Sequence, residues 1–132
     1  MMSNEAVREF KTSWLPNVTE AGLDRLIDLL DKGSPLLIQG CFTRALPTGC
    51  LATHAGWHHP QTSHLMLDAG ITWLHHVAGL NPATSRVIRE WDGCGGDTWA
   101  VRCELLQLLR AERSARGGIG ARTAARPALV EV

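Results

Sequence analysis

The sequence lacks several features that would define its class at once. It has no tyrosine, only two phenylalanines, and among its 13 basic residues only Lys11 and Lys32 are lysines. No stretch approaches the roughly 18 consecutive apolar residues of a membrane-spanning helix, and no apolar h-region of a secretory signal follows the first residues. Without an export signal, the four cysteines are expected to stay in a reducing compartment. We therefore expect a cytoplasmic protein.

Motifs for several common chemistries are also missing. The nucleophile motif G-x-S-x-G does not occur. The stretch Gly93-Cys94-Gly95-Gly96 lacks the preceding strand and the following lysine of a phosphate-binding loop. The cysteines do not show the close spacing of zinc knuckles. The sequence therefore favours a protein that binds over one that catalyses, and it leaves the question of an enzyme open.

Charge is distributed unevenly along the chain. The 132 residues carry no net charge and are 45% apolar, which fits a single globular domain. Between residues 36 and 85 only Arg44 and Asp68 are charged, and all six histidines lie in this segment. Charged side chains normally cover protein exteriors. We therefore expect the charge-poor segment, residues 36–85, to form core, a ligand site or an interface.

The hydrophobic pattern predicts an all-α fold, a small bundle of roughly five or six short helices. The clearest helix follows Thr19, a favourable N-cap, and ends at Gly33. Asn81-Pro82 marks the start of a later helix. Strand patterns are nearly absent, and residues 36–42 fit either a strand or a buried turn.

The C-terminal region is predicted in two parts. A last helix is expected from an N-cap at Asp97 to about Arg113, with an apolar face that includes Trp99. Residues 114–132 have too little apolar periodicity to fold alone. We therefore divide the chain into a helical domain, residues 1–113, and a flexible Arg-rich tail.

A central αα-hairpin is predicted over about residues 50–78. A short helix from Cys50 ends before Pro60, which disfavours helical geometry in the residue that precedes it. Thr62 or Ser63 can cap a second helix that runs to about Val77. The short connection favours antiparallel neighbours.

Four side chains of this hairpin form a candidate metal site. If the turn is centred on residue 61, His58 lies opposite His64, and His54 lies opposite Asp68. Imidazole and carboxylate ligands suit zinc, or another transition metal if a coordination position stays open. The same faces also carry a substitute ligand and two residues that could hydrogen-bond to the ligands: Cys50, Thr72 and His76.

The same histidines are also compatible with structural roles. His64 and Asp68 fit the solvent-facing side of an amphipathic helix. His58, close to Pro60, could cap the carbonyl groups at the end of a helix. Both interpretations stay open at this point.

Residues 71–92 resemble the helix-turn-helix headpieces of the lac-repressor family. The likeness is strongest over residues 78–84 and continues over residues 85–88, with one residue missing between the two parts. It implies DNA binding by a recognition helix over residues 82–91, which would offer four polar side chains to a groove: Thr84, Ser85, Arg86 and Arg89. The Arg-rich tail could add phosphate contacts. An ordinary helix start at Asn81-Pro82 is the alternative.

Together, these patterns predict a small non-catalytic binding or regulatory protein with a transition-metal site and a charge-poor interaction surface. Its partner would be a second copy, giving a homodimer, or another protein, because a domain of this size leaves much of its surface exposed. No membrane is expected as a partner. The first alternative is a nucleic-acid-binding regulator, and the second is a small metal-dependent hydrolase that uses the same histidines.

Overall fold

Helices provide the regular structure of the chain in this computed structural model, which describes residues 1–93 and 98–124 and gives side chains as far as residue 117. Within these residues there are six α-helices and no strand, so the all-α prediction is confirmed. The bounds are α1 Asn4–Glu9, α2 Glu20–Lys32, α3 Leu51–Trp57, α4 Ala69–Thr72, α5 Arg86–Gly93 and α6 Trp99–Ala124.

Two of the helices continue beyond these bounds without a break. α1 passes into a π-helical segment, Phe10–Trp14, and then a 3-10 turn, Leu15–Asn17. α4 continues as a second π-helical segment, Trp73–Val77. Trp14 and Trp73 are fully buried and meet edge to face, with ring centres 5.2 Å apart. These two tryptophans join the N-terminal helix to the second arm of the hairpin in the core.

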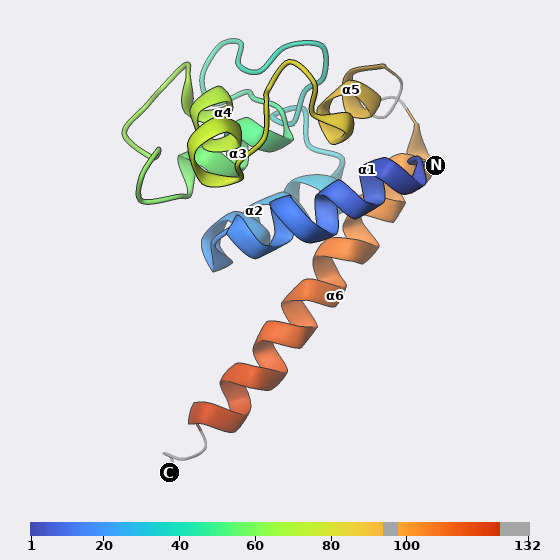
Figure 1. Cartoon of the computed structure of the whole chain (residues 1–132), viewed down its shortest axis with the longest axis vertical. Coiled ribbons are helices and arrows are strands. Elements are labelled where there is room, and N and C mark those ends of the chain that lie inside the picture. The colour runs from blue at the N-terminus through green and yellow to red at the C-terminus, as the bar shows by residue number, and fades with distance from the viewer. Residues whose placement is uncertain (94–97, 125–132) are drawn as a thin grey trace.

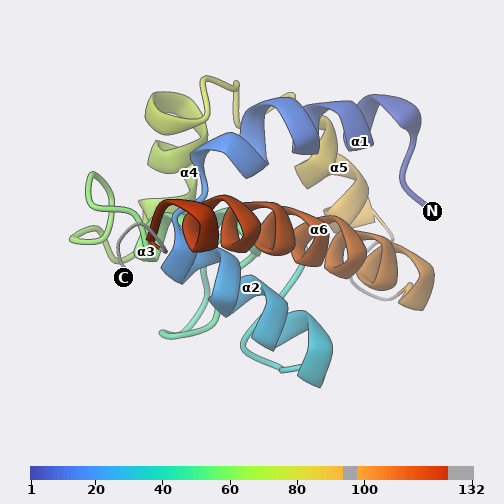
Figure 2. The same cartoon turned by 90° about the horizontal axis from the view of Figure 1, so that it is seen from below.

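In Figure 1, α1 and α2 lie between α6 and the other helices, and in Figure 2, the view from below, α6 runs in front of them, between α1 and α2. α6 packs along α2 on one side. On the other side, α3 contacts α2 and α5 contacts α1. The loops that lead into and out of α3 lie at the opposite end of the molecule from the last turn of α6 (Figure 1).

α2 forms as the sequence predicts. The Thr19 hydroxyl accepts a hydrogen bond from the Gly22 amide at 3.0 Å, and so caps the first turn. Gly33 ends the helix in the left-handed conformation, at φ 60°, which glycine adopts without steric cost. The Thr19 hydroxyl also donates to the His58 carbonyl at 2.6 Å. The cap therefore fixes the start of α2 against the end of α3.

The central hairpin exists, but its second arm begins later than predicted. α4 starts at Ala69, whereas a start at Thr62 or Ser63 was expected. The Thr62 hydroxyl is buried and donates to the Gly56 carbonyl at 2.6 Å, so it anchors a loop and caps no helix. Residues 58–68 consequently form a series of turns.

The loop of residues 36–50 is held by single bridges. Leu37 and Thr43 each form an isolated bridge with Gly49. The Cys50 amide donates to the Phe42 carbonyl at 2.8 Å, which closes the loop just before α3. Residues 36–42 are therefore not a strand, because they pair at isolated points and not as a ladder; they form turns and bends in which Leu37 is buried.

α5 begins at Arg86, four residues after the predicted start at Pro82. The Asn81 side-chain oxygen accepts from the Ala83 amide at 2.9 Å, which makes a local turn. The Ser85 hydroxyl takes the cap position and accepts from the Ile88 amide at 3.4 Å. The predicted cap of the next helix, Asp97, lies outside the described residues.

α6 extends past Arg113, where the sequence predicts the end of the helical domain, and continues to Ala124. Residues 114–124 are therefore helical where no helix was expected. Arg116 donates to the Leu15 carbonyl at 2.6 Å, which joins this part of α6 to the 3-10 turn that follows α1. Among the described residues, no helix is both long and apolar enough to cross a membrane.

Candidate functional site

His54, the first of the predicted metal ligands, is a packed part of the interior. Its side chain is 1% exposed, and its Nε2 lies 2.9 Å from the Leu36 carbonyl oxygen. Because a carbonyl only accepts, Nε2 carries the proton of the neutral ring. Burial lowers the pKa of His54, since a buried imidazolium loses its hydration.

We expect this burial to make stability pH-dependent. The unfolded chain protonates His54 near the ordinary value of about 6.5, while the folded chain does so only at lower pH. The contribution is complete above about pH 6.5 and is lost as the pH falls through the folded pKa. Urea unfolding should lose less free energy between about pH 8 and about pH 5.5 in His54→Gln than in the wild type.

The matched control for that experiment is His64→Gln, because His64 is exposed. It should lose as much stability as the wild type over the same pH interval. An equal loss in His54→Gln would mean that His54 takes up its proton in the folded state as readily as in the unfolded chain.

The remaining predicted ligands lie in different surroundings. His58 donates through Nδ1 to the His54 carbonyl at 2.9 Å. Cys50 is fully buried, and burial raises the pKa of its thiol to about 11. His64 and Asp68 are exposed in the loop that precedes α4.

The structure does not bring the predicted ligand set together. Among the described residues, no group of three or more His, Cys, Asp or Glu side chains is placed to hold a metal ion. The predicted facing of His54 and Asp68 assumed helix from residue 62, whereas Asp68 immediately precedes α4. Of the two residues expected to support the ligands, Thr72 is half-buried, and His76 is exposed and packs against His75.

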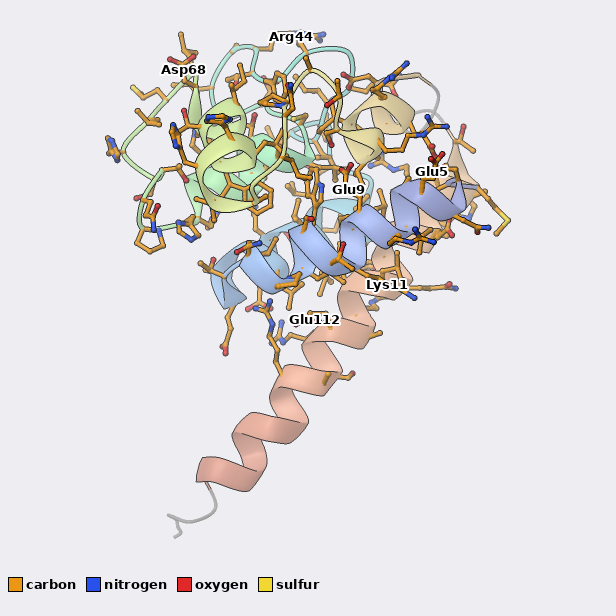
Figure 3. The ribbon with its side chains drawn as sticks, viewed as in Figure 1. Glu5, Glu9, Lys11, Arg44, Asp68 and Glu112 are labelled. Atoms are coloured by element: carbon orange, nitrogen blue, oxygen red, sulfur yellow. The ribbon has the colours of Figure 1, made fainter. Side chains whose placement is uncertain are left out.

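The residues of the predicted recognition helix are tied to the N-terminal helix. The Ser85 hydroxyl donates to a Glu9 carboxylate oxygen at 2.6 Å, and the Arg86 amide donates to the other at 2.8 Å. The Arg86 guanidinium pairs with Glu90 at 2.8 Å. Thr84 and Arg89 are exposed. Of the four side chains proposed for a groove, that of Ser85 thus holds α5 to α1 and that of Arg86 is paired within α5; α1 also packs against α5 (Figure 3).

The arginines near the tail are likewise engaged with the fold. Arg110 pairs with Asp31 at 2.8 Å, and Arg113 pairs with Asp24, both on α2. These contacts fasten α6 along α2. Arg122 and Arg126 lie beyond the side chains that the structure describes.

A pocket of about 260 Å³ opens within the charge-poor segment, between the loops on either side of α3. One wall comes from Leu46 and Pro47 in the loop before α3, and the other from Leu65 and Met66 in the loop after it. Trp57, the last residue of α3, and Ser63 complete the lining. None of these side chains is an acid, a base or a thiol, so the pocket suits an apolar group.

Hydrogen bonds hold the wall of the pocket in place. The Trp57 indole donates to the Met66 carbonyl at 3.0 Å, and the Thr43 hydroxyl donates to the Leu67 carbonyl at 3.1 Å. The Thr53 hydroxyl lies 3.3 Å from that of Thr43 and donates to the Phe42 carbonyl at 2.7 Å. Both loops are thus fastened to α3, and the pocket is formed before any partner arrives.

Four large apolar side chains of the charge-poor segment are exposed, and two of them, Leu46 and Met66, line the pocket. Met66 is 62% exposed and Leu67 is 61% exposed, and Leu46 and Ile71 are exposed as well. The hydrophobic pattern of residues 65–77 predicts a wide apolar stripe on one helix, which includes Met66, Leu67 and Ile71. In the structure these three side chains are exposed, whereas Ala69, Trp73 and Leu74 of the same stripe are buried.

Comparison with known proteins gives no relative from which a role could be transferred. No family model, no curated protein and no solved structure matches the chain. The helix-turn-helix resemblance therefore has no support beyond its residues, and the function must be argued from the site itself.

Proposed function

We propose that this chain is a binding protein that takes an apolar side chain of a polypeptide partner into the pocket beside Trp57. The observation that carries the proposal is the pocket itself, an apolar hollow whose lining includes the exposed side chains of Leu46 and Met66. Contiguous exposed apolar surface on a small protein is typical of interaction sites. The sequence gives independent support, because the segment that forms the pocket is almost free of charge.

The size and the lining of the pocket favour a side chain over a metabolite. Pockets for small molecules usually measure roughly 300–1,000 Å³ and carry several placed polar groups. This pocket, at about 260 Å³, is smaller, and its only polar lining side chains are the Trp57 indole and the Ser63 hydroxyl. The indole is already used by the Met66 carbonyl. A leucine- or phenylalanine-sized group fits this description.

The expected affinity follows from the area that such a contact buries. Full burial of one leucine-sized side chain contributes about 1.5–3 kcal/mol. One side chain alone therefore binds only weakly, and a specific partner must add contacts with the exposed apolar side chains of the charge-poor segment. Trp57 lines the pocket, and buried aromatic residues often dominate the binding energy of an interface.

We expect N-acetyl-leucine amide to shift the Trp57 indole N–H resonance of ¹⁵N-labelled protein at concentrations of about 10–100 mM, because a contribution of about 1.5–3 kcal/mol gives a Kd in this range. The Trp91 indole, which donates to the Ile38 carbonyl in the interior, is the internal reference and should not move. Met66→Glu should abolish the shift. Gln61→Glu adds the same charge to the same loop outside the lining and should leave the shift unchanged. No shift of Trp57, or equal shifts of both indoles, would rule out the proposal.

A further inference from the structure

One charge of each sign stands beside the pocket. Arg44 comes two residues before Leu46 in one wall, and Asp68 comes two residues after Met66 in the other. Arg44 and Asp68 are both exposed and lie at the same end of the molecule (Figure 3). Among the described residues, neither forms an ion pair. The surface around the pocket therefore carries exposed apolar side chains and one charge of each sign, which sum to zero.

We infer that the partner at this surface is a second copy of the same chain, in a two-fold dimer that pairs Arg44 of each copy with Asp68 of the other. This inference rests on the proposed binding at the pocket and names its occupant. In an isologous contact, residue i touches residue j while j touches i. A patch with one positive and one negative charge satisfies this rule twice, because the rotation that brings Arg44 to Asp68 also brings Asp68 to Arg44.

The shape of the surface is consistent with the same arrangement. A two-fold contact requires a patch that offers both a hollow and a projection. The pocket is the hollow, and the exposed side chains of Leu67 and Ile71, close to its Met66 wall in sequence, are the projections. Each copy can therefore place an apolar side chain in the pocket of the other while the charges set the rotation.

The charge of the chain favours a second copy over a strongly charged partner. The formal net charge is zero and the sequence pI is about 7.0, so two copies meet without net repulsion. An acidic or a basic partner would be attracted to neither the whole chain nor this surface. A second copy meets opposite charges at both ends of the contact.

The test is sedimentation velocity of the full chain with charge reversals at the two positions. The wild type should dimerise within the micromolar range. Arg44→Asp and Asp68→Arg should each weaken dimerisation by about tenfold or more, because each places two like-charge pairs at the interface. An equimolar mixture of the two variants should restore a dimer, because every pair is then again of opposite sign.

Lys11→Asp is the matched control, because it reverses an exposed positive charge on the π-helical segment after α1, away from this surface (Figure 3). It should dimerise like the wild type. Circular dichroism should show native helicity for all variants. Single reversals that dimerise like the wild type, or a mixture that stays monomeric, would overturn the inference.

The failure of this inference and the failure of the proposed function give different results. A concentration of about 100 μM is well above the micromolar dissociation constant expected of a specific dimer. If the wild-type chain is still monomeric at this concentration, the dimer inference is overturned. If N-acetyl-leucine amide still shifts the Trp57 resonance in that monomer, the pocket keeps its proposed role, and the partner is another polypeptide.

Discussion

Gly56→Ala is expected to destabilise the fold by about 3 kcal/mol, near the upper end of the usual cost of overpacking. A Cβ added at Gly56 would lie 2.4 Å from the Ala69 carbonyl oxygen and 2.8 Å from its carbon. Both atoms belong to the backbone of α4, so no rotamer change can relieve the contact. α3 and α4 would have to separate. Thermal unfolding followed by circular dichroism should show a midpoint lower by about 10 °C for a domain of this size.

Gly117→Ala is the matched control for this substitution. Gly117 lies within α6, and nothing stands within 4 Å of an added Cβ. Alanine is the better helix former by up to about 1 kcal/mol, so this variant should be unchanged or slightly more stable. Equal effects of the two substitutions would show that α3 and α4 do not cross as closely as described.

The same crossing also positions the pocket. Trp57 follows Gly56 directly, and its indole holds the loop that carries Met66. On the α4 side, a Cβ on Gly70 would lie 2.5 Å from the Thr53 hydroxyl, so this helix also approaches α3 closely. Small residues at the crossing therefore determine how far apart the two walls of the pocket stand. A folded Gly56→Ala protein should consequently also bind N-acetyl-leucine amide less well.

The sequence predicts the fold best where the signals are local. α2 is the clearest example, because its cap at Thr19 and its end at Gly33 are contacts within one turn of the helix. Prediction from the sequence fails where a distant group determines the residue at which a helix begins. Asn81-Pro82 is a good local start, but α5 begins at Arg86 because Glu9, 77 residues earlier, accepts the hydrogen bond of the Arg86 amide. The neighbouring residues offer two possible N-caps, Asn81 and Ser85, and do not show which of them begins the helix.

The candidate site was predicted in part. The scarcity of charge marks residues 36–85 as core or interface, and the pocket lies in this segment. The pocket itself was missed, because helical periodicity from residue 62 places Met66 and Leu67 on the apolar stripe of a helix. The buried hydrogen bond from the Thr62 hydroxyl to the Gly56 carbonyl anchors a loop at the place where that helix was expected to begin. Threonine before an apolar run is an N-cap signal, and only the packing reveals that its hydroxyl is used elsewhere.

Glu9→Ala is expected to cost about 3 kcal/mol, because hydrogen bonds to a charged group contribute about 1.5–3 kcal/mol each and are not additive. The carboxylate accepts from the Trp14 indole at 3.0 Å, the Ser85 hydroxyl at 2.6 Å, and the amides of Arg86 at 2.8 Å and Val87 at 3.2 Å. It therefore supplies the N-terminal cap of α5 from another helix, where a negative charge is also favoured by the helix dipole.

Glu5→Ala provides the comparison, because it removes the same charge from the same helix. Glu5 is exposed and stands 3.7 Å from Arg86, and a surface ion pair of this kind contributes about 0–1 kcal/mol. Urea unfolding should therefore separate the two variants by about 2 kcal/mol or more. In Glu9→Ala, the amides of Arg86 and Val87 should also exchange hydrogen faster, while those of α2 keep their protection relative to the global stability. If Glu9→Ala were no less stable than Glu5→Ala, α5 would have to be capped by Ser85 alone, and the start of the helix would be free of α1.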